Sequence, residues 1–287
     1  MQELLFAAPG ALEPTLVAAV LGLLLGSFLN VVIYRLPKMM QREFDNACAD
    51  NCGQEPRHLD TFNLSVPRSA CPCCGHKITA LENIPIISYL VLGGKCRGCK
   101  APISPRYPII EAIAGALSAL MIWKFGSGLA GLAAMAFALL LAMTFIDLDT
   151  MYLPDDLTYP LLWLGLLVNL DGAFAPLRDA VIGAVAGYLV LWSVNMLYKL
   201  VRKQDGMGGG DFKLLAALGA WMGWQMLPAI ILLSSVVGAL VGIAMIVLGK
   251  HGREQPIPFG PYLTGAGLLA MLYGPDITVF MQRFMLP

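Results

Sequence analysis

The sequence predicts an all-α polytopic membrane protein with about eight transmembrane helices and one small polar insert that holds every cysteine. Of its 287 residues, 57% are hydrophobic and only 13% are charged, with a mean hydropathy of +0.70. Soluble domains carry about a quarter charged residues, so this composition excludes an ordinary soluble domain. The formal net charge is zero and the pI is about 6.8, so no global basic field indicates a nucleic-acid partner.

The first apolar stretch spans residues 15–35 and can cross a hydrocarbon core of about 30 Å at about 1.5 Å per residue. The fourteen residues before it contain Glu3 and Glu13 but no Lys or Arg. They lack the basic start of a secretory signal peptide, so we expect a retained anchor with its N-terminus outside. Within this span, Arg35 is expected to snorkel towards water and Asn30 to contact another helix.

Seven further apolar stretches follow the polar insert. Two of them, 157–171 and 212–224, are short enough to be tilted, broken or half-buried. We therefore expect three domains: an anchor (1–36), a polar insert (37–108) and a seven-helix membrane domain (109–287). The seven stretches are 109–125, 129–146, 157–171, 178–201, 212–224, 226–249 and 260–283.

The Lys and Arg distribution predicts the topology. If eight spans are threaded from an outside N-terminus, sixteen Lys and Arg residues fall on one side and three on the other. Positively charged loops remain in the cytoplasm, so the insert is predicted to be cytoplasmic. The same threading places Asp147 and Asp211 on the cytoplasmic face, where they could meet.

The insert contains two CxxC pairs, Cys71 with Cys74 and Cys96 with Cys99. Four thiolates suit a tetrahedral zinc site, and Gly75 and Gly98 suit the tight turns around it. In a reducing cytoplasm this pattern predicts a zinc-ribbon-like structural site, with a redox or disulfide role as the alternative.

The other cysteines and the nearby histidine are weaker candidates. Cys73 is expected to be a spare thiol, and His76 to be solvated or hydrogen-bonded rather than a ligand. Cys48 and Cys52 form a looser CxxxC, which could be a second weak site, a redox pair or neither.

Two polar stretches in apolar sequence, residues 146–156 and 206–213, carry carboxylates, which are costly to place beside membrane spans. The chain has no HExxH or GxSxG motif. Two close aspartates can share a proton, activate water and protonate a scissile carbonyl, which is aspartyl proteolysis. We expect Asp147 and Asp211 to meet. Spacing alone leaves Asp149 as a rival to Asp147.

Structural roles for the same aspartates also have to be weighed. Asp211 could simply be a helix N-cap, and Asp155 or Asp156 could cap the helix after Pro154. The three glycines before Asp211, at 208–210, allow unusual backbone angles and close approach of an extended substrate. A proton-coupled transporter with a regulatory zinc domain, or a non-catalytic assembly subunit, are the rival functions.

Several motifs recur in a recognisable order: GSFLNVVIYRLP (26–37), the paired CxxC, NIP with GGKC, RYPIIE (106–111), IDLDTMYLPDDLTYPLLWLG (146–165), GMGGGDFKLLAALGAW (206–221) and PFGPYL (258–263). Over nearly its full length the chain resembles the bacterial type IV prepilin peptidases, or prepilin leader peptidase/N-methyltransferases. These belong to the GxGD class of membrane aspartyl proteases.

The resemblance implies a bacterial inner-membrane enzyme that acts on prepilins and type II secretion pseudopilins. It would cut off their basic leaders and then methylate the new N-terminus with S-adenosylmethionine. It also implies catalytic roles for Asp147 and Asp211, which decides against Asp149. Zinc would be held by Cys71, Cys74, Cys96 and Cys99, and the methyl donor would lie near Gly94, Lys95 and Glu111. Besides these substrates, the expected partner is membrane lipid.

Overall fold

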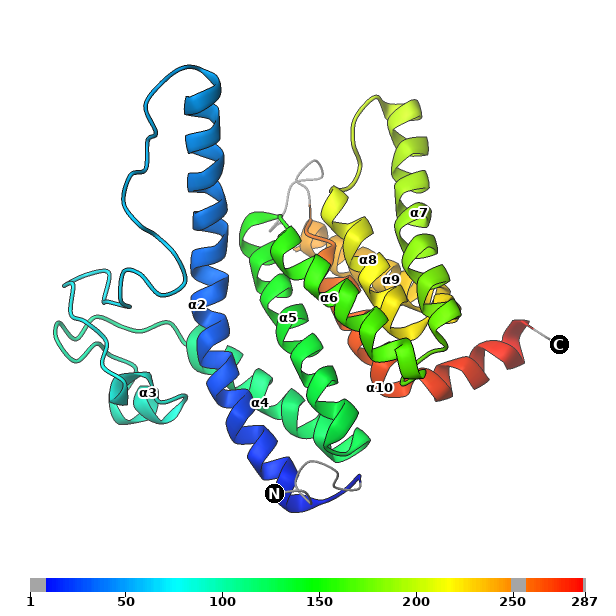
Figure 1. Cartoon of the computed structure of the whole chain (residues 1–287), viewed down its shortest axis with the longest axis horizontal. Helices are drawn as coiled ribbons and strands as arrows, with labels where there is room; N and C mark the ends of the chain where they lie inside the picture. Colours follow the sequence, from blue (N-terminus) through cyan, green and yellow to red (C-terminus); the bar gives the residue numbers. More distant parts are fainter. Residues whose placement is uncertain (1–8, 249–256, 286–287) are drawn as a thin grey trace. The chain divides into compact units, whose positions relative to one another are not determined.

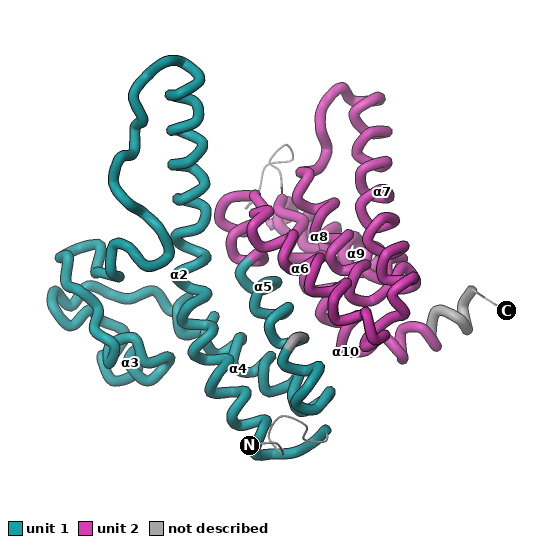
Figure 2. Tube along the Cα trace, viewed as in Figure 1, with its two compact units in different colours: residues 1–142 teal, residues 143–287 magenta. Residues whose placement is uncertain are grey.

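The computed structural model describes residues 9–248 and 257–285, and it divides into two compact units, residues 1–142 and 143–287 (Figure 2). Glu3 and the first eight residues of the expected anchor lie outside the described residues, as do Lys250 and Arg253 of the charge count. Regular structure in the described ranges is helical apart from two isolated β-bridges.

Each of the eight apolar stretches forms a helix (Figure 1). The helices are α2 (Leu12–Asn51), α4 (Arg106–Phe125), α5 (Gly128–Thr150), α6 (Asp155–Val168), α7 (Leu177–Arg202), α8 (Gly209–Met222), α9 (Leu227–Val247) and α10 (Gly260–Met285). A short helix, α3 (Ile87–Val91), lies in the polar insert.

Among the described residues, five helices are long and apolar enough to cross a membrane: α2, α4, α5, α7 and Trp224–Val247. The expected total of eight spans is not confirmed. Helices α6 and α8 have 14 residues each, or about 21 Å, which is shorter than a hydrocarbon core of about 30 Å. Helix α10 is interrupted by non-helical backbone at Tyr273 and contains Pro275.

In the first unit, α2 and α4 pack through small residues. A Cβ atom added to Gly26 would lie 2.6 Å from the Glu111 Cα, and one added to Gly22 would lie 2.7 Å from the Ala114 carbonyl oxygen. Missing side chains therefore let the two backbones approach closely, as is common between helices in membranes. Asn30 donates a hydrogen bond to the Tyr107 carbonyl of α4 at 3.2 Å, which confirms its expected helix contact.

Helix α2 continues to Asn51, so the expected boundary between anchor and insert at residue 36 falls inside a 40-residue helix. Pro37 lies within it without ending it. Arg35 does not snorkel: its side chain is buried and donates to the Asn63 and Pro67 carbonyls at 2.8 and 2.6 Å. The loop after α2 folds back and supplies these acceptors, which compensates for removing the guanidinium from water.

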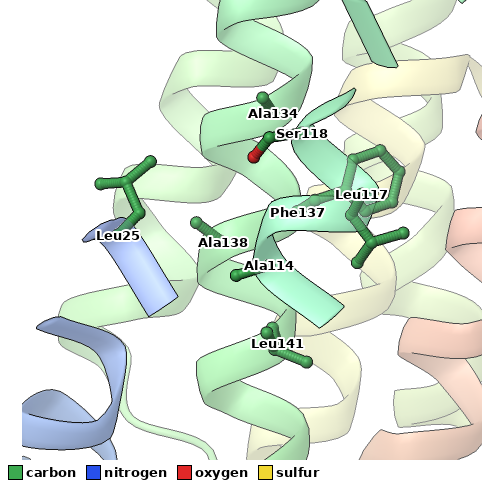
Figure 3. Close-up of a pocket in the computed structure, with 8 residues that line it drawn as sticks. All are labelled: Leu25, Ala114, Leu117, Ser118, Ala134, Phe137, Ala138 and Leu141. Carbon is green, nitrogen blue, oxygen red and sulfur yellow. The ribbon is translucent and has the colours of Figure 1, made fainter. Parts of the chain in front are cut away.

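The first unit also contains a small pocket between α2, α4 and α5 (Figure 3). Its volume is about 10 Å³, about the space of one water molecule. Ser118 is the only polar side chain that lines it. A bound water needs two to four polar partners, so this pocket is a packing gap and not a ligand site.

In the second unit, α8 is the core helix, and every residue from Asp211 to Met222 except Lys213 is buried. Gly187 lets α7 approach the Leu215 carbonyl of α8 closely. At the C-terminal end, buried Asn169 donates to the Ala220 and Trp221 carbonyls at 2.9 and 2.8 Å. These bonds satisfy carbonyls that a helix end leaves without partners, and they fix α8, which carries Asp211.

Candidate active site and metal centre

Asp147 lies in the last turn of α5 and is buried, with 4% of its surface exposed. Asp149 is exposed two residues later. Two residues correspond to about 200° around a helix, so only one of the two carboxylates can face the core. The fold thus separates the two candidates that spacing alone could not distinguish.

The Asp147 carboxylate is held by the start of α10. Its Oδ2 accepts a hydrogen bond from the Gly260 backbone N–H at 2.9 Å. Because N–H groups at a helix N-terminus lack helical partners and carry partial positive charge, they favour an anionic oxygen. Sequence reasoning missed this partner. The signal was a glycine between Phe259 and Pro261 at the start of an apolar stretch.

Asp211 lies in the first turn of α8 and is 8% exposed. The N-cap position belongs to Gly208, so Asp211 is not the helix cap that the sequence allowed. Leu153 packs against Gly210, which precedes Asp211, and against Gly260, which binds Asp147. The two buried aspartates therefore flank the same residue of the second unit, and a direct contact between them stays a prediction.

The three glycines before Asp211 do not have the backbone conformation that the sequence suggested. None of Gly208, Gly209 and Gly210 has a positive φ angle, so the unusual backbone predicted for them is wrong. Gly210 is required for packing, since an added Cβ would lie 2.7 Å from the Leu153 Cβ. An added Cβ on Gly209 would meet open space.

An ion pair joins the starts of α6 and α8 beside the aspartates. The Lys213 Nζ lies 2.6 and 2.7 Å from the two carboxylate oxygens of Asp155 and 5.3 Å from the centre of the Tyr159 ring. The N-cap of α6 is Pro154, and Asp155 makes no side-chain capping bond. The expected capping role of Asp155 or Asp156 is therefore wrong, because the Asp155 carboxylate forms an ion pair with Lys213.

Cys71, Cys74, Cys96 and Cys99 come together in the first unit, with all four sulfur atoms within 4.8 Å of one another. The Sγ atoms of Cys71 and Cys99 are 3.8 Å apart, and those of Cys74 and Cys96 are 4.0 Å apart. Zinc–sulfur bonds of about 2.3 Å in a tetrahedron place the sulfurs about 3.8 Å apart. The cluster therefore has the donor set and spacing that a tetrahedral zinc ion requires.

The two CxxC loops share one backbone pattern. The N–H of the residue after each second cysteine, Gly75 or Lys100, donates to the carbonyl of the first cysteine at 2.9 or 3.0 Å. Both residues have positive φ angles, +70° and +63°. The turn residue of the second loop is thus Lys100 and not Gly98. Gly98 instead provides space, since its added Cβ would lie 3.4 Å from the Cys74 sulfur.

Backbone amides support the thiolate form of the first cysteine. The N–H groups of Cys74 and Cys73 point at the Cys71 sulfur and lower the pKa of this thiol to about 6. Lower pKa values favour the deprotonated sulfur that binds metals. Cys73 lies outside the cluster, as expected.

The histidine beside the cluster is not part of it. The His76 Nε2 lies 3.2 Å from both carboxylate oxygens of Glu82, which confirms the expected hydrogen-bonded role. The Thr79 backbone N–H and hydroxyl, together with His76, hold the pKa of Glu82 at about 2. Cys48 and Cys52 are free thiols at the end of α2, and the structure assigns them no common role.

The three residues expected near a methyl donor occupy two separate positions. Gly94 has a φ of +68° and leads into the second CxxC loop, and Lys95 pairs with Pro102 in an isolated bridge. Glu111 is buried in α4 and accepts a hydrogen bond from the Ile86 N–H at 2.8 Å. In the described part of the chain, no hydrogen bond joins Glu111 to Gly94 or Lys95.

The chain matches two family models. Residues 20–125 match the bacterial peptidase A24 N-terminal domain, and residues 134–243 match the type IV leader peptidase family. A prepilin leader peptidase/N-methyltransferase of Aeromonas hydrophila is 56% identical over 259 residues, 89% of each chain. Proteins of the same name from Stutzerimonas stutzeri and Pseudomonas aeruginosa are each 54% identical and cover 97% and 92% of each chain. No solved structure matches the chain.

The fold and the two sites define a multi-pass, all-helical membrane protein with a buried carboxylate pair and a tetracysteine cluster. The relatives identify its family. The chain belongs to the prepilin leader peptidase/N-methyltransferase family, as its motifs indicated.

Proposed function

We propose that this protein cleaves the leader peptides of type IV prepilins and type II secretion pseudopilins, with Asp147 and Asp211 as its catalytic pair. The observation that supports the proposal is that two buried carboxylates flank Leu153, one in the first turn of α8 and the other bound to the first N–H of α10. Buried carboxylates at the ends of apolar helices are typical of a functional site.

The pair can perform both halves of amide hydrolysis. One ionised carboxylate removes a proton from water while the water oxygen attacks the scissile carbonyl carbon. The other carboxyl, still protonated, donates its proton to the carbonyl oxygen. When the C–N bond breaks, the departing amine takes a proton from the pair. The Gly260 N–H orients Asp147 throughout.

This proposal is tested by comparing the Asp147→Asn and Asp211→Asn variants with the wild type, using a purified prepilin and following leader loss. General acid–base catalysis contributes about 10²- to 10⁴-fold, so each variant should lose at least that much activity. Asp149→Asn is the matched control and, at saturating prepilin concentration, should keep a nearly normal cleavage rate. Normal cutting by either dyad variant would contradict the assignment and reopen the transporter and assembly-subunit alternatives.

We infer further that the four cysteines bind one structural zinc ion. The spacing of their sulfur atoms supports this, and the ion would fix the two CxxC loops to each other without taking part in the chemistry. Metal analysis of the purified protein should find one zinc per chain. Cys96→Ser should lose it, whereas Cys73→Ser should keep it. Loss of zinc from both variants, or from neither, would contradict the ligand set.

The names of the relatives support a second activity, methylation of the new N-terminus. S-adenosylmethionine would supply an electrophilic methyl group, and Gly94, Lys95 and Glu111 are the proposed binding residues. Lys95→Ala and Glu111→Gln should lower methyl incorporation into a mature pilin N-terminus without lowering leader cleavage. A glutamine at 111 can still accept the Ile86 N–H. Unchanged methylation in both variants would remove these residues from the site.

The proposed location is the bacterial inner membrane, with both sites facing the cytoplasm, as the Lys and Arg distribution predicts. Acidic residues near Asp147 could then attract the basic leader. Asp149, Asp155 and Asp156 carry this proposal. Neutralising the three together should weaken binding of basic leaders more than of neutral ones. Equal effects on the two kinds of leader would contradict it.

A further inference from the structure

An apolar surface lies on the cysteine insert, outside the candidate membrane spans. Residues 81–91, which include α3, expose five large apolar side chains, here called the α3 patch: Leu81, Ile84, Ile87, Leu90 and Val91. Val91 is 80% exposed and Leu90 is 70% exposed. Such a dense group of exposed apolar side chains is unusual on a surface that faces only water and indicates an interaction site.

The charges around this patch have one sign. Between Lys77 and Lys95 the only charged residue is Glu82, whose side chain is 8% exposed, is bound by Thr79 and His76 and lies 3.8 Å from the Arg97 guanidinium. The exposed charges at its two ends are all basic: Lys77, Lys95, Arg97 and Lys100. An apolar face bordered by Lys and Arg is the pattern of a segment that lies in the surface of an anionic bilayer.

A hydrogen bond to α4 fixes the position of the α3 patch relative to the membrane surface. Ile86, at its centre, donates its backbone N–H to Glu111 Oε2 at 2.8 Å. Glu111 lies five residues after the start of α4, or about 8 Å along the helix. Helix α4 has 20 residues and needs nearly all of its length of about 30 Å to cross the hydrocarbon core. The backbone of Ile86 is therefore held within about 8 Å of the level where α4 enters the hydrocarbon core.

We propose that the α3 patch is a membrane anchor of the insert, with its apolar side chains among the lipids of the leaflet and its basic border against anionic headgroups. This anchor holds the cysteine cluster against the bilayer surface. The proposal does not depend on leader cleavage, since it uses only contacts within the first unit, but it shares Glu111 and Lys95 with the proposed methyl-donor site.

The test replaces Leu90 with p-benzoyl-phenylalanine, a photoreactive residue, in the full-length protein reconstituted in vesicles. One set contains phosphatidylcholine only, and the other also contains phosphatidylglycerol. After irradiation, mass spectrometry identifies what is attached at this position. Zinc content checks that the insert is folded. A phospholipid adduct is expected, with a higher yield in the vesicles that contain phosphatidylglycerol.

Leu59 is the matched control because it is 84% exposed and is expected to lie away from the membrane. Its neighbour His58 is held by Asn46 of α2, about 24 Å along the helix from Asn30, which contacts the start of α4. The same photoreactive residue at 59 should give no lipid adduct.

Three results would overturn the proposal. Adducts at position 90 with another part of this chain or with a second copy would mean that protein covers the patch. Equal lipid yields at 90 and 59 would mean unspecific contact. Equal yields in the two kinds of vesicle would overturn the commitment to anionic lipid.

Replacing Lys77 and Arg97 with Gln should reduce the preference for phosphatidylglycerol.

Discussion

A Cβ atom on Gly260 would lie 2.6 Å from Asp147 Oδ2 and 3.3 Å from Leu153 Cδ2. Contacts below about 3 Å force atoms to move, and here the atoms belong to a proposed catalytic carboxylate. Gly260 is therefore needed for the room it leaves as well as for the hydrogen bond that its N–H donates.

We expect Gly260→Ala to reduce the kcat of leader cleavage by about 100-fold, since a catalytic group displaced by about 1 Å commonly costs that much. Gly265→Ala, on the same helix, is the control because its added Cβ meets nothing within 4 Å. The measurement is the cleavage rate of a purified prepilin at saturating concentration. Equal rates for the two variants would show that the Gly260 contact does not position Asp147.

The two CxxC loops offer a second test at the level of single residues. Lys100 has a φ of +63° where the equivalent Gly75 has +70°, and a non-glycine residue in this region costs about 1–2 kcal/mol. Lys100→Gly should therefore make the metal-bound insert more stable, and Gly75→Ala should make it less stable. Zinc loss at increasing chelator concentrations measures both. The same shift in both variants would contradict the strain argument.

The ion pair between Lys213 and Asp155 acts at the level of helices, because it joins the start of α8 to the start of α6. Leu153, between these starts, contacts Gly210 of α8 and Gly260 of α10. The pair therefore helps to hold the turn that packs beside both aspartates. Its side chains are 27% and 40% exposed, so solvent weakens the attraction.

A double-mutant cycle with Lys213→Ala and Asp155→Asn should give a coupling of about 0.5–1 kcal/mol in stability, the upper range for partly exposed pairs. The single variants should also lower kcat more than they raise KM, and Lys213→Arg should restore most of the loss. The control pair, Lys199 and Asp205, is 52% and 61% exposed and should show almost no coupling. Equal coupling in both pairs would refute a positioning role.

The close packing of α2 against α4 depends on Gly26. Gly26 lies against the backbone of Glu111, which cannot move aside as a flexible side chain could. Overpacking at such a contact costs about 1–3 kcal/mol. Gly26→Leu should therefore lower the Tm of the solubilised protein clearly, whereas Gly131→Leu, with nothing within 4 Å of the added Cβ, should not. Similar Tm values would show that α2 and α4 do not need this close approach.

For the whole molecule, the aspartate pair lies entirely in the second unit and the cysteine cluster entirely in the first. The Lys and Arg distribution predicts that both face the cytoplasm. All seven cysteines lie between Cys48 and Cys99, so thiol labelling of the wild type reports only on the side of the insert.

A membrane-impermeant maleimide should label Cys48 and Cys73 in inverted membrane vesicles but not in intact cells. For the other unit, Asp205→Cys in a variant with Ser at 48, 52 and 73 places one exposed thiol in the loop before α8. It should be labelled in the same vesicles and not in cells. Opposite labelling of the two positions would contradict the predicted topology.

Much of the architecture follows from the sequence. The eight apolar stretches become helices because burial of apolar side chains and internal hydrogen bonding leave few other structures for them in lipid. The number of helices that cross the membrane cannot be predicted from the number of apolar stretches, since α6 and α8 are too short to cross alone. The paired cysteines were predicted from spacing, because two CxxC loops contain their own turns.

The helical membrane class and the four clustered cysteines follow from the sequence, because composition and local spacing carry these features. The pairing of Asp147 with Asp211 was predicted from the threading of the spans and the family resemblance, and it stays a prediction. Only the tertiary structure decided that Asp147 is buried and Asp149 exposed, that Gly260 binds Asp147, that Lys213 takes Asp155, and that Arg35 is buried against loop carbonyls. Each of these contacts joins residues far apart in the chain or depends on which helix face is covered. Such contacts form only when whole helices and loops pack, so no local pattern encodes them.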